Sequence, residues 1–267
     1  MNPAASSSPL SVLQITDTHL GAQPGATLLG MDTDDSLQAV LKEISEENVP
    51  ANVLIATGDI ALNGAASSYR RFAEYAEDLA PLQSWIAGNH DLAAVMDETE
   101  AGPRKRHLVF DHWQLIALDS AVPGEVGGHL ADSELALLDQ CLSAYPDHHA
   151  LVTVHHHLLS IGCEWLDEQK ISNADAMLAR LQHHSAQVVC VHGHIHQEVD
   201  VQQGNTRILA TPSTCIQFAP NSADFLLDQR NPGYRRLNLH ADGSIETSVR
   251  RVTHREFIVD TRSGGYE

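Results

Sequence analysis

The chain has 267 residues, of which 43% are hydrophobic and 19% are charged. This balance is typical of a globular protein with a full hydrophobic core and excludes a disordered chain. Acidic residues outnumber basic ones by 35 to 16, so the formal net charge is −19. Such a charge argues against nucleic-acid and membrane partners, because both present extended negative surfaces. A small anionic substrate remains compatible with it if metal ions hold the anion.

Targeting and redox features predict a cytoplasmic protein. No segment approaches the roughly 18 consecutive apolar residues of a membrane span. Residues 1–9 lack the basic start and apolar stretch of a signal peptide. The four cysteines, Cys141, Cys163, Cys190 and Cys215, are scattered without C-x-x-C pairing. That usage suits a reducing compartment and predicts neither a disulfide framework nor a zinc ribbon.

The first two-thirds of the chain alternates strand-like and helix-like segments. Strands are expected at residues 10–15, 52–57, 83–87, 150–154 and 187–191, and helices at 32–47, 67–80, 131–143 and 173–184. Asp32 or Asp34 is expected to cap the first helix, and residues 106–118 to form a hairpin. From about residue 206 the chain is mostly strand-like, which predicts a second sheet packed on the first. The pattern indicates an α/β layered fold in a single domain, residues 1–267.

Five polar clusters each follow a predicted strand. They are Asp17-Thr18-His19, Gly58-Asp59, Gly88-Asn89-His90-Asp91, His155-His156-His157 and Gly193-His194-Ile195-His196. Ligands of α/β proteins bind beyond the carboxyl ends of strands, so five such clusters can converge on one crevice. The glycines before the polar residues suit tight turns and close backbone approach. Each cluster alone is a weak signal, and Gly-Asn-His-Asp is also a good turn sequence. Their joint occurrence points to a metal site.

The residue types indicate which metals fit. Carboxylate, amide oxygen and imidazole together suit Mn, Fe or Zn and are too rich in nitrogen for a Ca or Mg cage. Seven candidate ligands exceed the needs of one tetrahedral ion, but they suit two ions that share a bridging carboxylate.

These clusters together resemble the calcineurin-like metallophosphoesterase family. The finer likeness is to the class III bacterial 3′,5′-cyclic-AMP phosphodiesterases. It is carried by residues 13–20, 56–59, 162–167, 193–198, 209–215 and 240–243. The resemblance implies a four-layer fold, a β-sandwich flanked by helices, with the metal site at the carboxyl ends of strands. It also implies hydrolysis of cyclic AMP to 5′-AMP, which would lower intracellular cyclic AMP.

The resemblance further implies two divalent ions per chain, Fe²⁺ or Mn²⁺ in the first place and Zn²⁺ or Mg²⁺ as alternatives. One ion would be held by Asp17, His19, Asp59 and His196. The other would be held by Asp59, Asn89, His155 and His194, so that Asp59 bridges the two. Strand alternation leaves open which histidine of the 155–157 run faces the metals. His155 is taken from the resemblance alone, and His156 and His157 are expected either beside the ligands or at the surface.

The same resemblance yields expectations for the substrate. Its phosphate would contact four of the ligands, His19, Asp59, Asn89 and His196. His90 is the candidate catalytic residue, since imidazole titrates near neutral pH and can protonate the leaving 3′ oxygen. Trp165 is a candidate wall of the base pocket, although tryptophan in such a loop more often serves packing.

Other interpretations remain at this point. The phosphoprotein-phosphatase branch carries an Asp-Arg pair where this chain has Leu62 and Asn63, which disfavours a phosphoserine phosphatase. A broad phosphodiesterase acting on 2′,3′-cyclic nucleotides or other small diesters is the main alternative. A non-catalytic metal-dependent binding module is a weaker one, because every ligand position and His90 are present. The protein is expected to be a monomer or a homodimer.

Overall fold

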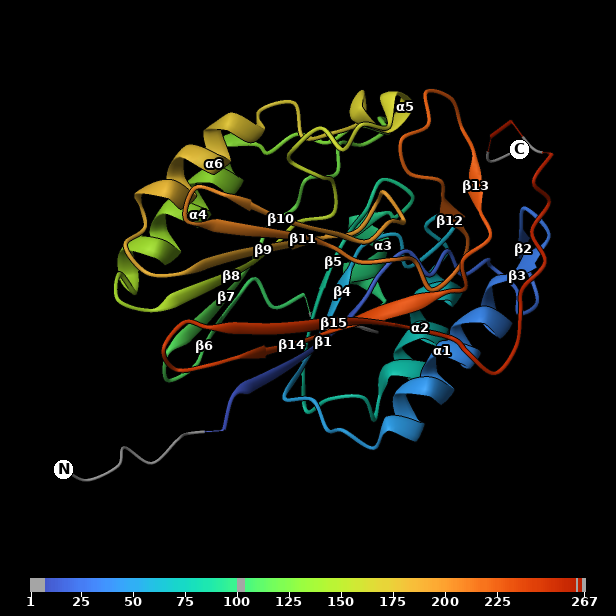
Figure 1. The fold of residues 1–267 in the computed structure, drawn as a ribbon, viewed down its shortest axis with the longest axis horizontal. Helices are drawn as coiled ribbons and strands as arrows, with labels where there is room; N and C mark the ends of the chain where they lie inside the picture. Colours follow the sequence, from blue (N-terminus) through green and yellow to red (C-terminus); the bar gives the residue numbers. More distant parts are fainter. Residues whose placement is uncertain (1–7, 100–103, 263, 266–267) are drawn as a thin grey trace.

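The computed structural model describes residues 8–99, 104–262 and 264–265. Its strands form two main sheets (Figure 1). The five-stranded sheet has the order β15 (Ile245–Arg251), β14 (Gly233–Leu239), β1 (Leu10–Ile15), β4 (Val53–Thr57) and β5 (Leu82–Ile86). The six-stranded sheet has the order β10 (Val199–Gln203), β11 (Thr206–Ala210), β9 (Val188–His192), β8 (His149–Thr153), β7 (Trp113–Ala117) and β6 (His107–Val109). The N-terminal residues 1–7, which bear on the signal-peptide expectation, lie outside the described residues.

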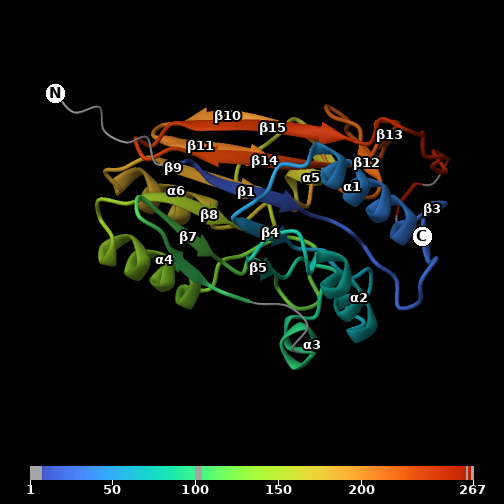
Figure 2. The same cartoon turned by 90° about the horizontal axis from the view of Figure 1, so that it is seen from below.

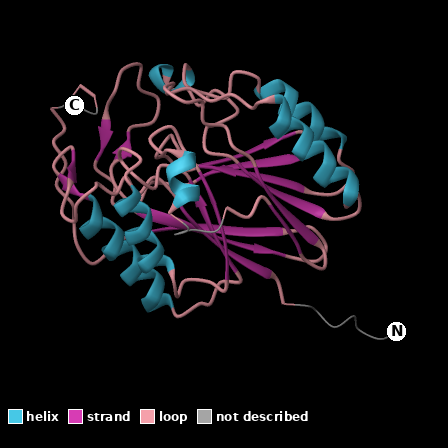
Figure 3. Cartoon of the chain, turned by 180° about the vertical axis from the view of Figure 1, so that it is seen from behind, coloured by secondary structure: helices cyan, strands magenta, loops and turns pink. Residues whose placement is uncertain are grey.

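Helices cover the outer face of each sheet, which makes four layers (Figure 3). Helices α1 (Thr33–Glu47) and α2 (Ala66–Ala76) pack on the five-stranded sheet. Helices α4 (Asp132–Ala144) and α6 (Ala174–His183) pack on the six-stranded one. Two short helices, α3 (Ala93–Glu98) and α5 (Glu164–Asp167), and two small hairpins complete the fold. The hairpins are β2 (Thr27–Leu28) with β3 (Met31–Asp32), and β12 (Gln217–Phe218) with β13 (Leu227–Asp228).

Alternation along the strands explains the layers, because successive side chains point to opposite faces of a sheet. In β1, Leu13 packs against the helices while Val12 packs between the sheets. In β8, Val152 faces the helices and Leu151 faces the other sheet. Strands buried on both faces therefore read as continuous apolar runs, as the sequence shows.

Most expected elements are confirmed, with differences at their ends. Asp32 caps α1, since its carboxylate accepts a hydrogen bond of 3.0 Å from the backbone N–H of Asp35. The helix expected at 67–80 ends at Ala76. The carbonyl of Ala76 accepts the backbone N–H of Leu79 at 3.1 Å and the side-chain amide of Gln83 at 2.8 Å, in place of a backbone N–H four residues further on. The short helices α3 and α5 were not expected.

The β-rich tail does not form the second main sheet by itself, so that expectation was wrong; within the described part of the tail, only its small hairpin β12–β13 stands apart from the two main sheets. Strand β14 instead pairs antiparallel with β1, and β11 pairs parallel with β9 (Figure 2). The tail therefore extends both sheets. The backbone groups at the edges of β1 and β9 need partners, and the tail supplies them. Among the described residues, none of the helices has the length and apolar character needed to span a bilayer.

A buried guanidinium ties the two sheets together. Arg235 of β14 is only 2% exposed. It donates hydrogen bonds to the carbonyls of Ala210 at 2.7 Å and Val199 at 3.3 Å, and to the hydroxyls of Thr211 at 3.1 Å and Thr247 at 2.9 Å. Burial lowers the pKa of Arg235 to about 10, so it still carries its charge near neutral pH. These bonds span from the five-stranded sheet to β10 and β11.

We predict that Arg235→Met lowers the free energy of unfolding by about 2–4 kcal/mol. The substitution leaves buried carbonyl and hydroxyl acceptors without a donor, and each loss of this kind costs about 1–3 kcal/mol. Chemical denaturation measures it. Arg250→Met is the matched control, because Arg250 is 61% exposed and surface ion pairs contribute about 0–1 kcal/mol. Equal losses in the two variants would contradict a structural role for the buried guanidinium.

Candidate metal centre

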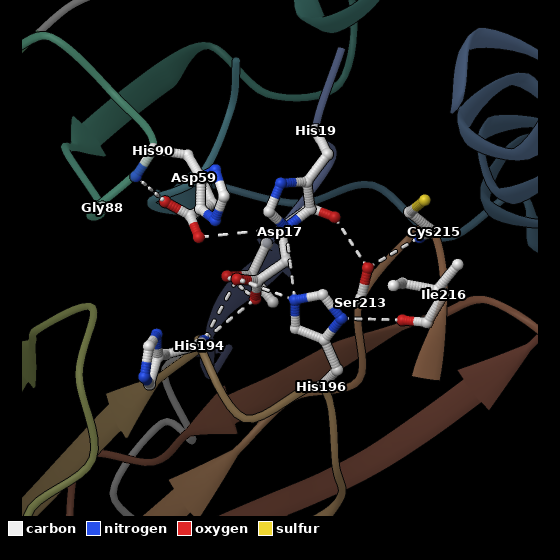
Figure 4. A network of polar contacts seen from close by, with 12 residues as sticks. Asp17, His19, Asp59, Gly88, His90, His194, His196, Ser213, Cys215 and Ile216 are labelled. Atoms are coloured by element: carbon white, nitrogen blue, oxygen red, sulfur yellow. Dashed lines mark hydrogen bonds and ion pairs between the residues drawn. The ribbon is translucent and has the colours of Figure 1, made fainter. Parts of the chain in front are cut away.

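The candidate ligands lie just beyond the carboxyl ends of five strands, three in one sheet and two in the other. β1 leads to Asp17 and His19, β4 to Asp59, β5 to Asn89 and His90, β8 to His155, and β9 to His194 and His196. Residues up to 179 positions apart in the chain thus meet at one end of the sandwich (17 to 196). Figure 4 shows the side chains of Asp17, His19, Asp59 and His196 close together, with the backbone N–H of His194 donating to Asp17.

One set of atoms matches the first expected ion. His19 Nε2 lies 3.2 Å from His196 Nε2, and His196 Nε2 lies 3.4 Å from Asp17 Oδ1. His19 Nε2 is 3.8 Å from Asp59 Oδ2. Atoms bound to one ion at about 2.0–2.2 Å lie about 3.0–3.6 Å apart in octahedral or tetrahedral geometry. The spacing therefore suits a shared ion.

A second set matches the other expected ion and uses the same Asp59 oxygen. His155 Nε2 lies 3.3 Å from Asp59 Oδ2 and 3.2 Å from Asn89 Oδ1. His194 Nδ1 lies 3.0 Å from Asn89 Oδ1. Asp59 Oδ2 is thus near a nitrogen of each set, the position that a bridging carboxylate needs.

Backbone carbonyls orient the imidazole rings so that their Nε2 atoms face the carboxylate and amide oxygens of the other candidate ligands. Nδ1 of His155 faces the carbonyl of Thr57 at 2.8 Å, and Nδ1 of His196 faces the carbonyl of Ile216 at 2.8 Å. A carbonyl only accepts, so each Nδ1 carries a proton and each Nε2 is the atom that can offer a lone pair to a metal ion. Lone pairs that face carboxylate and amide oxygens repel one another unless a cation lies between them. The donor set therefore fits bound metal.

The charge state of the cluster also favours a bound metal ion. Burial would raise the pKa of Asp59, but the charges of His155 and His90 outweigh it, so the pKa lies well below its usual range. Burial lowers the pKa of His19 to about 3, which leaves that imidazole neutral. Burial opposes a charge on His155 too, yet the attraction of Asp59 raises its pKa to about 9. The cluster thus favours a positive charge at its centre.

Unusual backbone conformations are concentrated at the ligands. Eight described non-glycine residues have positive φ, and five of them are candidate ligands: Asp17 (54°), His19 (45°), Asp59 (50°), His194 (67°) and His196 (48°). This region costs a non-glycine residue about 1–3 kcal/mol, so the surrounding contacts must hold it. Strain of this kind is common at functional sites.

Two glycines permit the close packing of the ligand loops. Gly58 has φ of +97°, and a Cβ there would lie 2.4 Å from His155 Nδ1. A Cβ on Gly88 would lie 2.2 Å from Asp59 Oδ1. Any larger residue at either position would push a ligand out of place, which is the physical reason for glycine before Asp59 and Asn89.

Asp91, which the sequence places in a cluster but assigns no role, joins two ligand loops. Its carboxylate accepts backbone N–H groups from Ile60 at 3.2 Å, Ala61 at 2.9 Å and Gly88 at 2.9 Å. Burial raises its pKa to about 6. The carboxylate therefore fixes the loop that carries Asp59 against the loop that carries Asn89.

The two remaining histidines of the 155–157 run are buried, so of the two expected positions the one beside the ligands is confirmed and the surface one is excluded. His156 uses both ring nitrogens, toward the Ser120 hydroxyl at 2.9 Å and the Val126 carbonyl at 3.0 Å. Its ring lies edge-on to His155, with centroids 4.8 Å apart. His157 stacks on His194 with centroids 5.8 Å apart. Both support the ligands through ring contacts.

His90 lies at the edge of the centre. Its backbone N–H donates to Asp59 Oδ1 at 2.9 Å, and its Nδ1 faces the Leu62 carbonyl at 3.0 Å. Its Nδ1 therefore carries a proton, and Nε2 is the atom that can exchange one. His90 also lines a cavity of about 360 Å³, whose other lining residues are Asp59, Asn89, Val126, Trp165, Leu166, Gln169, His194, Phe218, Phe225, Gly264 and Gly265.

The cavity joins the metal centre to an aromatic cluster. Trp165 meets Phe218 edge-on at 5.0 Å and Phe225 at 5.2 Å between ring centroids. Phe218 also stacks on His196 at 4.3 Å. The sequence pointed to Trp165 but not to the two phenylalanines, because isolated phenylalanines outside a recognisable motif carry no positional signal.

A family model for calcineurin-like phosphoesterases matches residues 10–198, which include all five clusters. The chain belongs to the calcineurin-like phosphoesterase family. Membership confirms the resemblance that the motifs indicated. It also agrees with the cluster geometry, since the buried His and Asp groups together suggest a dinuclear metal site.

Relatives within this family span the whole chain. The protein is 40% identical to the 3′,5′-cyclic adenosine monophosphate phosphodiesterase CpdA of Pseudomonas aeruginosa, with 99% of this chain and 98% of that protein covered. It is 41% identical to the CpdA of Escherichia coli (strain K12), with the same coverage.

Solved structures share the fold at low identity. A dimetal phosphatase from Danio rerio superimposes with a TM-score of 0.59 at 12% identity, covering 92% of this chain and 100% of that one. A purple acid phosphatase from yellow lupin gives 0.61 at 13% identity, covering 97% and 54%. These likenesses confirm the expected four-layer fold of the phosphoesterase family.

We predict that Asp91→Ala lowers the free energy of unfolding by about 2–4 kcal/mol, since it leaves three buried N–H groups without an acceptor. The measurement is denaturation of protein kept in a strong chelator, so that only contacts of the chain contribute. Asp97→Ala is the control, because Asp97 is 60% exposed. A stability like that of the control would mean that Asp91 does not hold the two loops.

Proposed function

We propose that this phosphoesterase hydrolyses 3′,5′-cyclic AMP to 5′-AMP with two divalent ions. The observation that carries the proposal is the Asp59 oxygen shared by two ligand sets at the mouth of an aromatic cavity. The ligand sets suit a phosphodiester and the aromatic side chains suit a nucleobase. The activity named for the CpdA relatives, at about 40% identity over the full chain, supports this substrate.

The chain's residues divide between holding ions and acting on substrate. Asp17, His19 and His196 hold one ion, Asn89, His155 and His194 hold the other, and Asp59 belongs to both. When bound, such ions would lower the pKa of water and neutralise charge on the phosphate. The mixed nitrogen and oxygen set favours Fe²⁺ or Mn²⁺. The phosphate lies against His19, Asp59, Asn89 and His196.

His90 supplies a proton in the bond-breaking step. Water attacks phosphorus, the bond from phosphorus to the 3′ oxygen breaks, and that oxygen would leave as a poor alkoxide. His90 Nε2 donates a proton to it, which yields the 3′ hydroxyl of 5′-AMP. The hydrogen bond from Nδ1 to the Leu62 carbonyl keeps the ring oriented. Trp165 forms one wall of the base pocket.

Metal dependence tests the proposal. We predict that protein treated with a strong chelator loses hydrolysis of 3′,5′-cyclic AMP and regains it on addition of Mn²⁺ or Fe²⁺. Asp59→Asn should bind neither ion tightly and stay inactive, because Asp59 belongs to both ligand sets. Metal content is measured by elemental analysis, and products by chromatography.

Asp78→Asn is the control for that experiment, because Asp78 is exposed and lies between α2 and β5, before the strand instead of beyond its carboxyl end. Full metal content and normal turnover in Asp59→Asn would refute the two-ion site. Faster hydrolysis of 2′,3′-cyclic AMP than of the 3′,5′ isomer by the native protein would refute the substrate.

A further prediction tests the role of His90 as the proton donor. We predict that His90→Ala keeps both ions and loses about 10²–10⁴ in kcat on cyclic AMP, the usual contribution of a general acid. The loss should shrink for bis(4-nitrophenyl) phosphate, because nitrophenolate leaves without a proton. His112→Ala, an exposed histidine outside the centre, should behave as the native protein. An equal loss on both substrates would mean that His90 binds phosphate, and a fall in metal content would make it a ligand.

A further inference from the structure

The cavity beside the metal centre is lined by polar residues on the metal side and mainly by apolar residues elsewhere. Its metal-side residues are Asp59, Asn89, His90 and His194, and most of its remaining side chains are apolar or aromatic. Gln169 is the exception, because its carboxamide offers both a donor and an acceptor. The indole N–H of Trp165 is buried and has no hydrogen-bond partner among the described residues, and it can only donate. Gln169 is therefore the side chain in this part of the lining that can both donate and accept a hydrogen bond.

The backbone of Gln169 is held in place. Its N–H donates to the Leu166 carbonyl at 2.8 Å, and its carbonyl accepts from Gly128 at 3.2 Å. The preceding helix α5 is anchored by Asp167, whose carboxylate accepts the backbone N–H groups of Ile161 at 2.7 Å and Gly162 at 3.2 Å. The backbone at this position is therefore fixed, and only the side-chain torsions of Gln169 remain to be ordered when a ligand binds.

The carboxamide of Gln169 is not engaged elsewhere. Across the described ranges, its only hydrogen bonds are those of its backbone. Both the amide N–H₂ and the amide oxygen are therefore available to a molecule in the cavity. A ligand that leaves such groups unmatched loses affinity relative to one that pairs with them.

We propose that Gln169 hydrogen-bonds the edge of the purine base, so that replacing its carboxamide changes the preference between adenine and guanine. A carboxamide pairs with adenine through two hydrogen bonds, accepting from the exocyclic amino group and donating to the neighbouring ring nitrogen. A carboxylate at the same place only accepts. It suits the adjacent N1–H and N2–H₂ donors of guanine and repels the ring-nitrogen acceptor of adenine. This inference rests on the proposed function, since it assumes that a cyclic nucleotide occupies the cavity.

Gln169→Glu tests the inference in the metal-loaded, full-length protein. The substrates are 3′,5′-cyclic AMP, 3′,5′-cyclic GMP and bis(4-nitrophenyl) phosphate, which carries no base. The ratio of kcat/KM for cyclic AMP to that for cyclic GMP should fall roughly 10-fold or more, since a bidentate base contact discriminates by about 1–3 kcal/mol. The change should lie in KM. The nitrophenyl diester reports folding and general charge effects, which act on all three substrates together and cancel in the ratio.

Two further variants sharpen the experiment. Gln169→Leu should weaken both nucleotides and bring their kcat/KM values closer together. Glu168→Gln, at an exposed neighbour that does not line the cavity, should leave the ratio unchanged. An unchanged ratio in Gln169→Glu, or an equal loss on all three substrates, would overturn the role of Gln169 alone. Absence of cyclic-AMP hydrolysis by the native protein would overturn the proposed function and this inference together.

Discussion

The main constraint on this structure is the burial of two carboxylates, Asp17 and Asp59, whose negative charges the surrounding residues must compensate. They are 0% and 2% exposed, and an isolated buried carboxylate is costly unless it is paired or hydrogen-bonded. Here the backbone N–H groups of His194 and His90 donate to them, at 3.1 Å and 2.9 Å. Imidazoles surround both. The arrangement compensates the two charges only in part, and divalent ions would complete it.

The sandwich supplies the rigidity that this arrangement requires. Ligands in the left-handed region persist only where their surroundings hold them, and each follows a strand buried in the core. Arg235 binds one sheet to the other, and Asp91 binds the Asp59 loop to the Asn89 loop. Arg235 thereby helps to hold the two sheets together, and Asp91 holds together two ligand loops of the five-stranded sheet.

In the proposed function, the metal centre binds the charged phosphate and the cavity binds the remainder of the substrate by its shape. A chain with a net charge of −19 does not attract an anion over long distances, so attraction must be local to the ions. The apolar lining formed by Trp165, Phe218 and Phe225 then excludes water around the remainder of the substrate. In a setting of that kind a single carboxamide, Gln169, has large influence, because unmatched polar groups are costly where water is excluded.

The order of motifs alone determined the family, the layered α/β class and the candidate ligands, from Asp17-x-His19 to Gly193-His194-x-His196. It did so because ligand type and position after a strand are local properties of the chain. Tertiary structure alone decided that β14 joins β1, that His156 and His157 are buried, and that Asp91 clamps two loops. It alone also brought Phe218, Phe225 and Gln169 to one cavity. Those outcomes depend on which distant segments pack together, and packing partners leave no trace in the spacing of residues along the chain.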